Sequence, residues 1–428
     1  MENTKLNGTK LPAKRVKISG EKNATVLENA GLKVLIEDIG SMIPEMSLIN
    51  DKQRINAHWL PWFRSNSGKP YQASEHDAFW KSGLLYNVAG NFPCIPNFGP
   101  DHIIDGINMP PHGWTANLPW LFISSGNDEE SGAVWALSVM ECPDEAMPLF
   151  FRKIDVLVPD HNIHYVSISI ANKGTKDHEI CMGWHNTVGA PFLAAGCRIS
   201  AAASVWATAP CGSEFDNTTR LVPGMEFLSL SEAPLGSGNV TTGVTDLSRV
   251  PGPLGYTDFV TGRIDSSLDL GWSSVINPEL KAAYICFFTG SASAQEDDII
   301  LRFNNLWMQY GGRPFTPWAP YEGGTDLCYC LGTENSLAAY AMGLDYSRKM
   351  KSLLGAPTTV TIPCGKQKCI RYGTLFAQYQ GQVLDEGILS LETEAKMLVS
   401  KGRTGHWRFN ADPSFRILKN IESKVNSM

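Results

Sequence analysis

The stretch HYVSISIAN, residues 164–172, decides the fold class. Val166, Ile168 and Ile170 alternate with more polar residues, and turn-forming Asn-Lys-Gly follows at once. Period-two alternation places the apolar side chains on one face of an extended chain. The stretch therefore predicts a half-buried β-strand.

Similar segments recur between residues 30 and 380, each of strand length and bounded by Gly, Pro, Asn, Asp or Ser. They are LKVLIEDIG (32–40), SGAVWALSVM (131–140), KAAYICFFTG (281–290), DIILRF (298–303) and TTVTIP (358–363). Helix-length periodic segments are few, and no repeat of 20 to 50 residues is visible. This pattern favours a large all-β sandwich or barrel over alternating β and α units.

The chain divides into three parts on composition. We expect a polar N-terminal tail over residues 1–28, a β-domain over 29–380 and a helical C-terminal extension over 381–428. Within the β-domain, residues 71–80 and 336–354 read as helical or loop excursions. In the extension, LSLETEAKMLVSKG is helix-like, and DPSFRILKNIESKV opens with Asp412 as a helix N-cap and Pro413 at the first helical position.

Charge and cysteine usage exclude several classes of protein. The formal net charge is -7 with a pI near 5.8, whereas nucleic-acid binding needs clustered Lys and Arg. The one basic cluster, Lys10–Lys22, is expected to be solvated. No apolar run approaches the roughly 18 residues of a membrane span, and the first residues lack the apolar stretch of a signal peptide. The ten cysteines are scattered, which is typical of buried thiols in a reducing compartment, so we expect a soluble cytoplasmic protein.

No metal site or cofactor is expected. The pairs Cys328/Cys330 and Cys364/Cys369 lack the C-x-x-C spacing of zinc ligands.

Three short segments carry candidate catalytic side chains. In NMPPHGWTANLPW, His112 follows two prolines and precedes a glycine, so a rigid loop presents it. In CMGWHNTVGAPF, His185 falls near the end of the second arm of a predicted β-hairpin. In DLCYCLGTENSL, Glu334 follows a short apolar run and could be a general base whose pKa is set by burial. Taken alone, each histidine is better explained as a surface or packing residue, and Glu334 equally well as a carboxylate in the first turn of a helix.

The order of the three segments along the chain favours a catalytic interpretation of His112, His185 and Glu334 over a structural one. The chain resembles the aldose 1-epimerase (galactose mutarotase-like) family, whose pattern G-x-x-M-P-x-H-G matches Gly106–Gly113. The pattern N-x-G…G-W-H matches Asn172–His185, and W…Y…C-L-G-x-E runs from Trp307 through Tyr321 to Glu334. The resemblance spans roughly residues 30 to 375.

The resemblance implies a β-supersandwich with a sugar held in an open cleft on one sheet. It implies that His185 is the general acid, Glu334 the general base, and His112 a sugar-binding residue. Exchange of α and β anomers removes a proton from the O1 hydroxyl and delivers one to the ring oxygen, which suits an ionised carboxylate and an imidazolium near neutral pH. The expected activity is that of a carbohydrate isomerase.

Further sugar contacts are expected from aromatic and polar residues. Trp114 and Trp184 adjoin the two histidines, and aromatic faces stack on the C–H faces of sugars. Asn97 and Asp258 stand nearest to the sugar-binding amide and aspartate positions of the family. The family's arginine beside that Asn is absent, and Asp101, His102 or Arg64 are candidate replacements.

Two alternatives stay open on sequence. A lyase or glycoside-processing enzyme could use the same fold, although hydrolysis usually needs two carboxylates and only Glu334 stands out. A non-catalytic sugar-binding protein would need the aromatic residues and His112 but not an ionised Glu334. The sequence does not indicate the oligomeric state or the particular sugar.

Overall fold

The computed structural model describes residues 13–20, 22–49, 54–252 and 254–426. Residues 1–12, which belong to the expected N-terminal tail, lie outside the described ranges.

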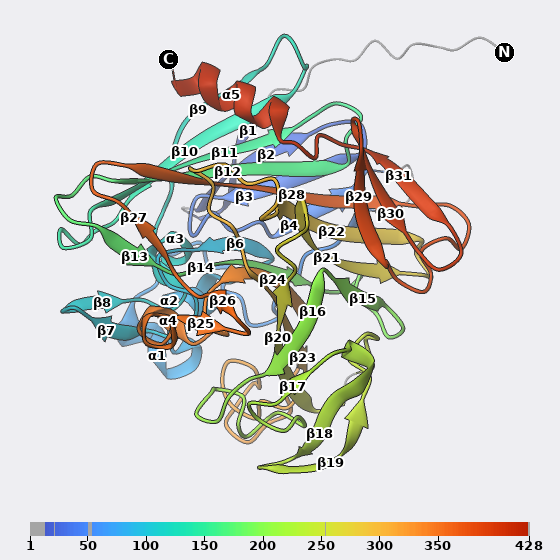
Figure 1. Ribbon diagram of the computed structural model, residues 1–428. Helices are drawn as coiled ribbons and strands as arrows, with labels where there is room; N and C mark the ends of the chain where they lie inside the picture. Colours follow the sequence, from blue (N-terminus) through green and yellow to red (C-terminus); the bar gives the residue numbers. More distant parts are fainter. Residues whose placement is uncertain (1–12, 21, 50–53, 253, 427–428) are drawn as a thin grey trace.

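Two large antiparallel sheets form the body of the molecule, the eight-stranded one above the seven-stranded one in Figure 1. The eight-stranded sheet has the order β15 (Arg198–Ala201), β21 (Leu270–Asn277), β22 (Ala282–Thr289), β28 (Gln367–Gln378), β12 (Ile163–Asn172), β11 (Leu149–Leu157), β10 (Val134–Glu141), β9 (Leu121–Asn127). The seven-stranded sheet has the order β17 (Glu226–Phe227), β16 (Ala203–Thr208), β20 (Tyr256–Ile264), β23 (Phe303–Tyr310), β24 (Tyr329–Leu337), β14 (Met182–Val188), β6 (Asn91–Cys94). The predicted all-β sandwich is therefore confirmed.

Smaller elements surround the two sheets. A five-stranded sheet runs β1 (Lys14–Ser19), β2 (Lys22–Glu28), β3 (Leu32–Glu37), β4 (Glu45–Leu48), β5 (Ile55–Asn56), and a three-stranded sheet runs β29 (Ser390–Glu394), β30 (Met397–Lys401), β31 (His406–Asn410). The two-stranded pairs are β7 (His102–Ile104) with β8 (Ile107–Met109), β13 (His178–Ile180) with β27 (Val360–Ile362), β18 (Ala233–Ser237) with β19 (Val240–Thr245), and β25 (Ser352–Leu353) with β26 (Ala356–Pro357). The helices are α1 (Ala73–Trp80), α2 (Gly83–Asn87), α3 (Gly113–Asn117), α4 (Gly343–Met350), α5 (Arg416–Asn426) and the 3-10 turn η1 (Leu230–Glu232).

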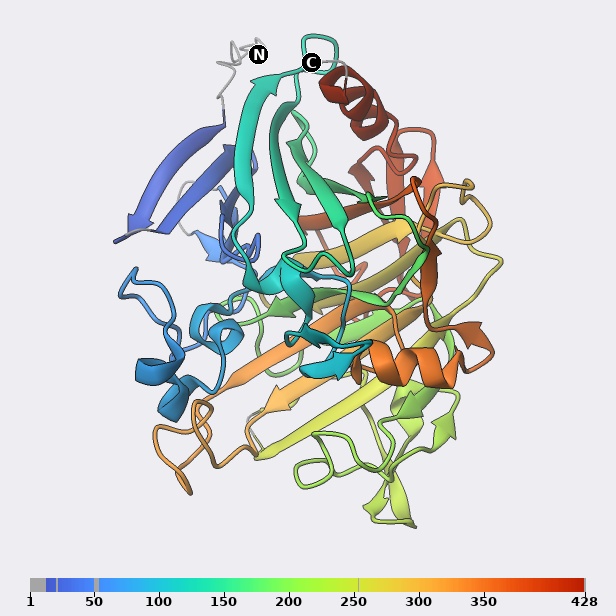
Figure 2. The ribbon, with the colours of Figure 1, turned by 90° about the vertical axis from the view of Figure 1, so that its left-hand side faces the viewer.

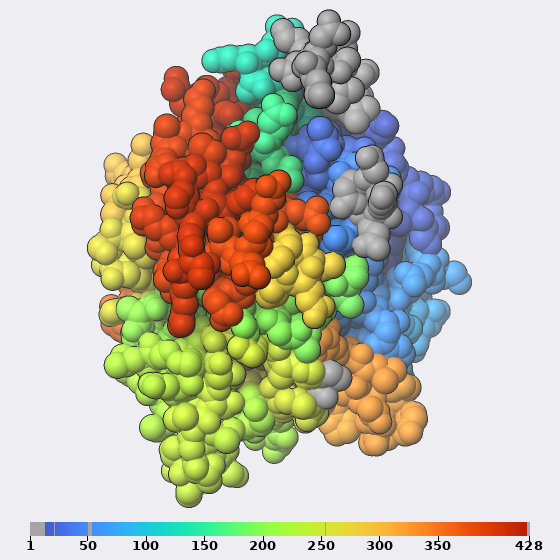
Figure 3. Space-filling model, turned by 90° about the vertical axis from the view of Figure 1, so that its right-hand side faces the viewer, coloured from blue at the N-terminus to red at the C-terminus, as the bar shows by residue number. Residues whose placement is uncertain are grey.

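Helices α1 to α4 and the β7–β8 hairpin lie on one side of the molecule, at the left in Figure 1 and toward the viewer in Figure 2. The β18–β19 hairpin projects at the bottom of Figure 1 and forms the lowest part of the view in Figure 3. Among the helices that the structure describes, none combines the length and the apolar character that crossing a membrane requires.

The faces of the seven-stranded sheet have different surroundings. Toward the eight-stranded sheet, Trp184 of β14 stacks on Tyr372 of β28 with ring centroids 4.7 Å apart, and the Tyr372 hydroxyl donates a hydrogen bond to Asn335 of β24. Adjacent residues of a strand point to opposite faces. His185, next to Trp184, and Glu334, next to Asn335, therefore point away from the sandwich interior.

The strand predicted from HYVSISIAN is present as β12, but both of its faces are covered. Tyr165 and Ser167, expected on the solvent side, are 1% and 3% exposed. Phe415 packs edge-on against the Tyr165 ring, and the backbone N–H of Asp412 donates to the Tyr165 hydroxyl. The C-terminal segment covers this face, which no pattern within the strand could show.

The expected polar tail is wrong for Lys14–Ser19 and Lys22–Glu28, which form β1 and β2. Ala24, Val26 and Leu27 of β2 are buried in the core. Of the basic cluster, Lys14 and Lys17 are exposed as expected. Arg15 instead pairs with Asp38, and the Lys22 ammonium donates to the Ser65 carbonyl. Lys10 lies outside the described residues.

The expected C-terminal helix is present only as α5, where Asp412 accepts a hydrogen bond from the backbone N–H of Ile417. Leu389–Gly402, expected to be helical, instead forms β29 and β30. The charged residues of this segment, which suggested a helix, instead form ion pairs across the strands. Lys401 and Glu392, for example, lie 2.6 Å apart. The segment lies beside β21 and β22 of the eight-stranded sheet in Figure 1, and β29 packs against β21.

The other segments predicted as helices, loops or strands are confirmed in part. Residues 71–80 contain α1, and residues 336–354 begin with the end of β24 and contain α4. Of DIILRF only Phe303 belongs to a strand. The preceding residues form a loop in which Asp298 makes an isolated parallel β-bridge with Cys369.

Candidate active site

A cavity of about 430 Å³ lies on the face of the seven-stranded sheet that points away from the sandwich. Five adjacent strands each contribute one side chain to it: Phe92 from β6, His185 from β14, Glu334 from β24, Trp307 from β23 and Phe259 from β20. Loops and helix ends complete the wall, with Trp59, Lys81, Asp101, His112, Glu214, Phe215, Arg313, Phe315 and Trp318. The volume lies within the usual range for a small-molecule site.

His185 and Glu334 form a buried acid–base pair on the sheet side of this cavity. His185 Nε2 lies 3.3 Å from Glu334 Oε1, and the two side chains are 8% and 4% exposed. The Thr187 hydroxyl lies 2.9 Å from His185 Nδ1. The Phe92 ring stacks on the imidazole at 4.5 Å between centroids. The imidazole is therefore fixed in orientation with Nε2 toward the carboxyl group.

Burial dominates the acid–base properties of the pair. Burial, reinforced by the neighbouring His112, holds the pKa of His185 well below its ordinary value of 6.5. Burial, reinforced by the charge of Glu214, raises the pKa of Glu334 well above its ordinary value of 4.5. Burial thus opposes the charged form of both groups. It favours the neutral imidazole beside a protonated carboxyl over the imidazolium and carboxylate expected from the sequence, and the two forms differ by transfer of one proton.

His112 is the third member of the cluster. Its ring centroid lies 5.3 Å from that of His185, and burial lowers its pKa to about 4. Its backbone has φ 57°, a conformation uncommon outside glycine and frequent at functional sites. At Gly113, φ is +75° and a Cβ would meet the Ile95 carbonyl oxygen at 2.3 Å, so the His-Gly sequence suits this tight approach.

Four buried polar atoms on residues that line the cavity lack a hydrogen-bond partner within the described chain. They are Glu334 Oε2, His112 Nδ1, Trp307 Nε1 and Arg313 Nε. Buried polar groups are normally paired, because an unpaired one costs about 1–3 kcal/mol. These four atoms are therefore the candidate hydrogen-bonding groups of the cavity wall.

No protein-family model matches the chain, and no curated protein matches it. Solved structures do. A "putative aldose 1-epimerase" from Klebsiella pneumoniae subsp. pneumoniae superposes with a TM-score of 0.60 at 14% identity, covering 85% of this chain and 82% of that one. A galactose mutarotase-like protein from Clostridium acetobutylicum superposes with a TM-score of 0.54 at 12% identity, covering 86% of this chain and 99% of that one.

The chain has the galactose mutarotase-like fold. At these identities the comparisons establish the fold alone, so the role of each side chain rests on the geometry of this chain.

Within the galactose mutarotase-like fold, His112, His185 and Glu334 meet in one cavity although 222 residues separate the first from the last in the chain. Trp184 does not join them. It is fully buried against Tyr372 between the two large sheets and is absent from the cavity wall. Its neighbour His185 occupies the cavity face, so the strand cannot place Trp184 there as well.

Asp258 likewise points away from the cavity, which its neighbour Phe259 lines. Its two carboxylate oxygens accept hydrogen bonds from Thr219 Oγ1 and from the backbone and guanidinium N–H groups of Arg220. The expected sugar contact is thus replaced by a structural ion pair that holds the 219–220 loop on β20.

Replacing Asp258 with Ala is expected to lower the free energy of unfolding by about 1.5–3 kcal/mol, because Arg220 loses its charged partner. Chemical denaturation measures this, with Asp101→Ala as the control, because Asp101 is exposed and such substitutions usually change stability little. Unchanged stability together with lost sugar binding would restore the role expected from the sequence.

Asn97 and Trp114 do not line the cavity. Asn97 Nδ2 donates to the carbonyls of Pro100 and Pro110, and Oδ1 accepts from the backbone N–H of Leu344. Asn97 therefore holds the loop that leads to His112. Trp114, in α3, is 5% exposed and packs in the core. Neither side chain is placed for the direct sugar contact expected from the sequence.

Of the residues considered as replacements for the family's arginine, only Asp101 lines the cavity. Arg64 pairs with Glu37, and His102 Nδ1 contacts the Pro100 carbonyl. The cavity's arginine is Arg313, from the loop after β23. Arg313 lies in the segment GGRPFTPW, residues 311–318, and the aromatic residues of this loop are the only feature of the sequence that pointed to a ligand site there.

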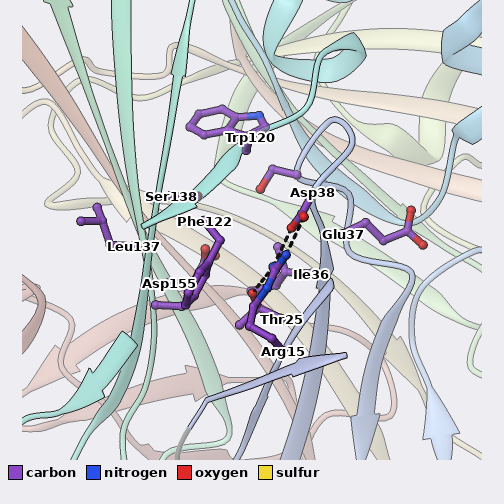
Figure 4. A pocket seen from close by; sticks show the side chains of 12 residues that line it. Arg15, Thr25, Ile36, Glu37, Asp38, Trp120, Phe122, Leu137, Ser138 and Asp155 are labelled. Atoms are coloured by element: carbon purple, nitrogen blue, oxygen red, sulfur yellow. Dashed lines mark hydrogen bonds and ion pairs between the residues drawn. The ribbon is translucent and has the colours of Figure 1, made fainter. Parts of the chain in front are cut away.

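A second cavity lies between the β1–β3 strands and the β9–β11 strands (Figure 4). Arg15 and Asp38 pair across it, and Trp120 and Asp155 also line it. Its volume of about 10 Å³ has room for roughly one water molecule. It is too small for a sugar. The first cavity is the candidate site because His112, His185 and Glu334 meet there.

Among the residues described, no group of three or more His, Cys, Asp or Glu side chains is placed to hold a metal ion. All ten cysteines lie within the described ranges, and each is a free thiol.

Proposed function

We propose that this protein is a carbohydrate isomerase that interconverts the α and β anomers of an aldose, with His185 and Glu334 transferring the protons. The observation that carries the proposal is the buried pair itself, with His185 Nε2 and Glu334 Oε1 3.3 Å apart on the floor of a sugar-sized cavity. The fold supports it, because solved structures of this fold include proteins described as aldose 1-epimerases.

Anomer exchange needs one transferable proton on the pair formed by His185 and Glu334. A sugar hydroxyl that donates to the unpartnered Glu334 Oε2 stabilises the carboxylate, which favours transfer of the carboxyl proton to His185. Glu334 then takes the proton of the O1 hydroxyl while His185 delivers its proton to the ring oxygen. The C1–O5 bond breaks, an aldehyde forms at C1, and rotation about C1–C2 exposes its other face. Ring closure returns both protons, so the pair ends as it began.

Other cavity residues would bind and orient the sugar. His112 Nδ1 and Trp307 Nε1 are free to meet hydroxyl groups. Trp59 and Trp318 are stacked parallel to each other at 6.3 Å, beside Trp307 at 6.0 Å and 5.8 Å, and offer an aromatic wall to the C–H face of a pyranose.

The test is exchange of pure α-D-glucose or α-D-galactose toward anomeric equilibrium, followed by polarimetry and by NMR exchange spectroscopy. Acceleration over buffer that is proportional to protein concentration is expected. Absence of acceleration with every free aldose in a broad panel would overturn the proposal. Bond cleavage in a parallel panel of glycosides, or formation of an unsaturated product, would instead indicate a glycoside-processing enzyme or a lyase.

The pH dependence of exchange follows from the two pKa directions. Acid adds a second proton to the pair, and because burial lowers the pKa of His185, the rate is expected to fall only well below pH 6.5. Alkali removes the remaining proton, and the raised pKa of Glu334 keeps that proton well above pH 4.5. The value of kcat/KM, corrected for spontaneous exchange at each pH, should therefore trace a bell with its acid limb below 6.5. A rate that rises as pH falls through 6.5 would contradict this protonation scheme.

We also propose a reducing, cytoplasmic location. It is supported by the ten unpaired cysteines, seven of which are buried.

A further inference from the structure

We propose that the cavity is built for an aldose that carries an anionic group, a carboxylate or a phosphate, and that Arg313 binds this group. The proposal takes the cavity as the sugar site of the proposed function and adds the substrate class. Measurements of binding alone test the proposal, so its outcome is independent of whether the protein catalyses anomer exchange.

Arg313 is a buried cation in the wall of the cavity. Its side chain is 5% exposed, and its guanidinium carbon lies 4.6 Å from the centroid of the Trp318 ring and 5.8 Å from that of Trp307. Stacking on aromatic rings holds the guanidinium plane but does not neutralise its charge. A buried charge is costly unless it is paired and hydrogen-bonded.

The pairing of Arg313 within the protein is incomplete. Nη2 lies 3.2 Å from Glu214 Oε2, but the Glu214 side chain is 62% exposed, and ion pairs with an exposed partner contribute little. Nε is buried and has no partner in the described chain. Asp326 lies nearby, yet its oxygens accept from the Gln309 side chain and from the backbone N–H groups of Arg313 and Cys328. An anion that displaces Glu214 from Nη2 would also supply the missing acceptor for Nε, which makes two parallel hydrogen bonds.

A second cation stands on the same wall. Lys81 lines the cavity, and its ammonium lies 3.6 Å from Glu322, with both side chains more than half exposed. Each cation of the cavity is thus held by an exposed carboxylate that an incoming anion can displace. Lys81 broadens the positive region without being required for the Arg313 contact.

The position of Arg313 fits a substituent remote from the anomeric carbon. The Trp307 centroid lies 5.6 Å from that of His185 and 5.8 Å from the Arg313 guanidinium carbon. One indole ring therefore separates the proton-transferring pair from the cation. A pyranose lying along Trp307, with C1 at His185 and Glu334, would direct its far end and any anionic group there to Arg313.

Titration calorimetry at fixed ionic strength tests the proposal with D-glucose 6-phosphate, D-glucuronate and D-glucose. The parent is expected to bind at least one of the two anionic sugars more tightly than glucose, and the comparison of the two distinguishes phosphate from carboxylate. In Arg313→Met, which keeps the packing stem, that affinity should fall by about 10- to 100-fold while glucose affinity changes less than about threefold. Inorganic phosphate serves as the probe of charge without the sugar.

Glu214→Gln provides a test that does not depend on altering a buried residue. Because Glu214 is exposed and competes for the guanidinium, its removal should tighten binding of the anionic sugar by a few fold. Glucose binding equal to that of both anionic sugars in the parent would overturn the proposal. So would an equal loss for all three sugars in a folded Arg313→Met, or weaker anion binding in Glu214→Gln. Failure of the exchange assay with these sugars, with the binding differences intact, would instead count against the isomerase function.

Discussion

Replacement of Glu334 with Gln is expected to reduce anomer exchange by about 10²- to 10⁴-fold, the usual contribution of a positioned acid or base. Gln keeps the size of the side chain and can still accept a hydrogen bond, but it can neither take the O1 proton nor hold the proton that the pair needs. Since Glu334 is 3% exposed, water is poorly placed to substitute for it. Polarimetry with the purified variant, corrected for spontaneous exchange, measures the loss.

Two observations make this result specific. Glu145→Gln removes an exposed carboxylate that does not line the cavity, and should leave exchange within a few fold of the parent. Sugar binding by Glu334→Gln, measured by calorimetry, should change far less than the exchange rate, because the residue acts mainly in the transition state. Exchange by Glu334→Gln within a few fold of the parent would remove Glu334 from the mechanism.

The sequence could predict the fold class because alternation is a local property of each strand. The segments around Val166, Val134 and Ala282 all became strands of the eight-stranded sheet. Two errors at the ends of the chain have one cause. Lys14–Ser19, Lys22–Glu28, Ser390–Glu394 and Met397–Lys401 are strands because they pair and pack with other parts of the molecule. Their many charged and polar residues did not indicate that packing.

The same alternation explains which of the predicted site residues line the cavity and which do not. His185 and Glu334 point to the cavity, so Trp184 must point to the core, and Phe259 in the cavity turns Asp258 away. A strict period-two reading from His185 would have excluded Trp184 at once. Arg313 and Glu214 lie in loops, and loops without periodicity carry no signal of which sheet face they cover, so only the structure could bring them to the cavity.

Replacement of His185 with Asn is expected to cause a loss of similar size, about 10²- to 10⁴-fold, because the amide cannot exchange a proton with the ring oxygen. The Asn amide can still meet the Thr187 hydroxyl, which lies 2.9 Å from Nδ1 in the parent, so the local packing is largely kept. The decisive measurement is the double variant His185→Asn/Glu334→Gln. If the two groups work as one proton-sharing pair, the double variant should lose little more than the worse single variant, because removing either group already disables the other. Losses that multiply instead would mean that His185 and Glu334 act independently, and the 3.3 Å contact between them would then be structural rather than part of the reaction.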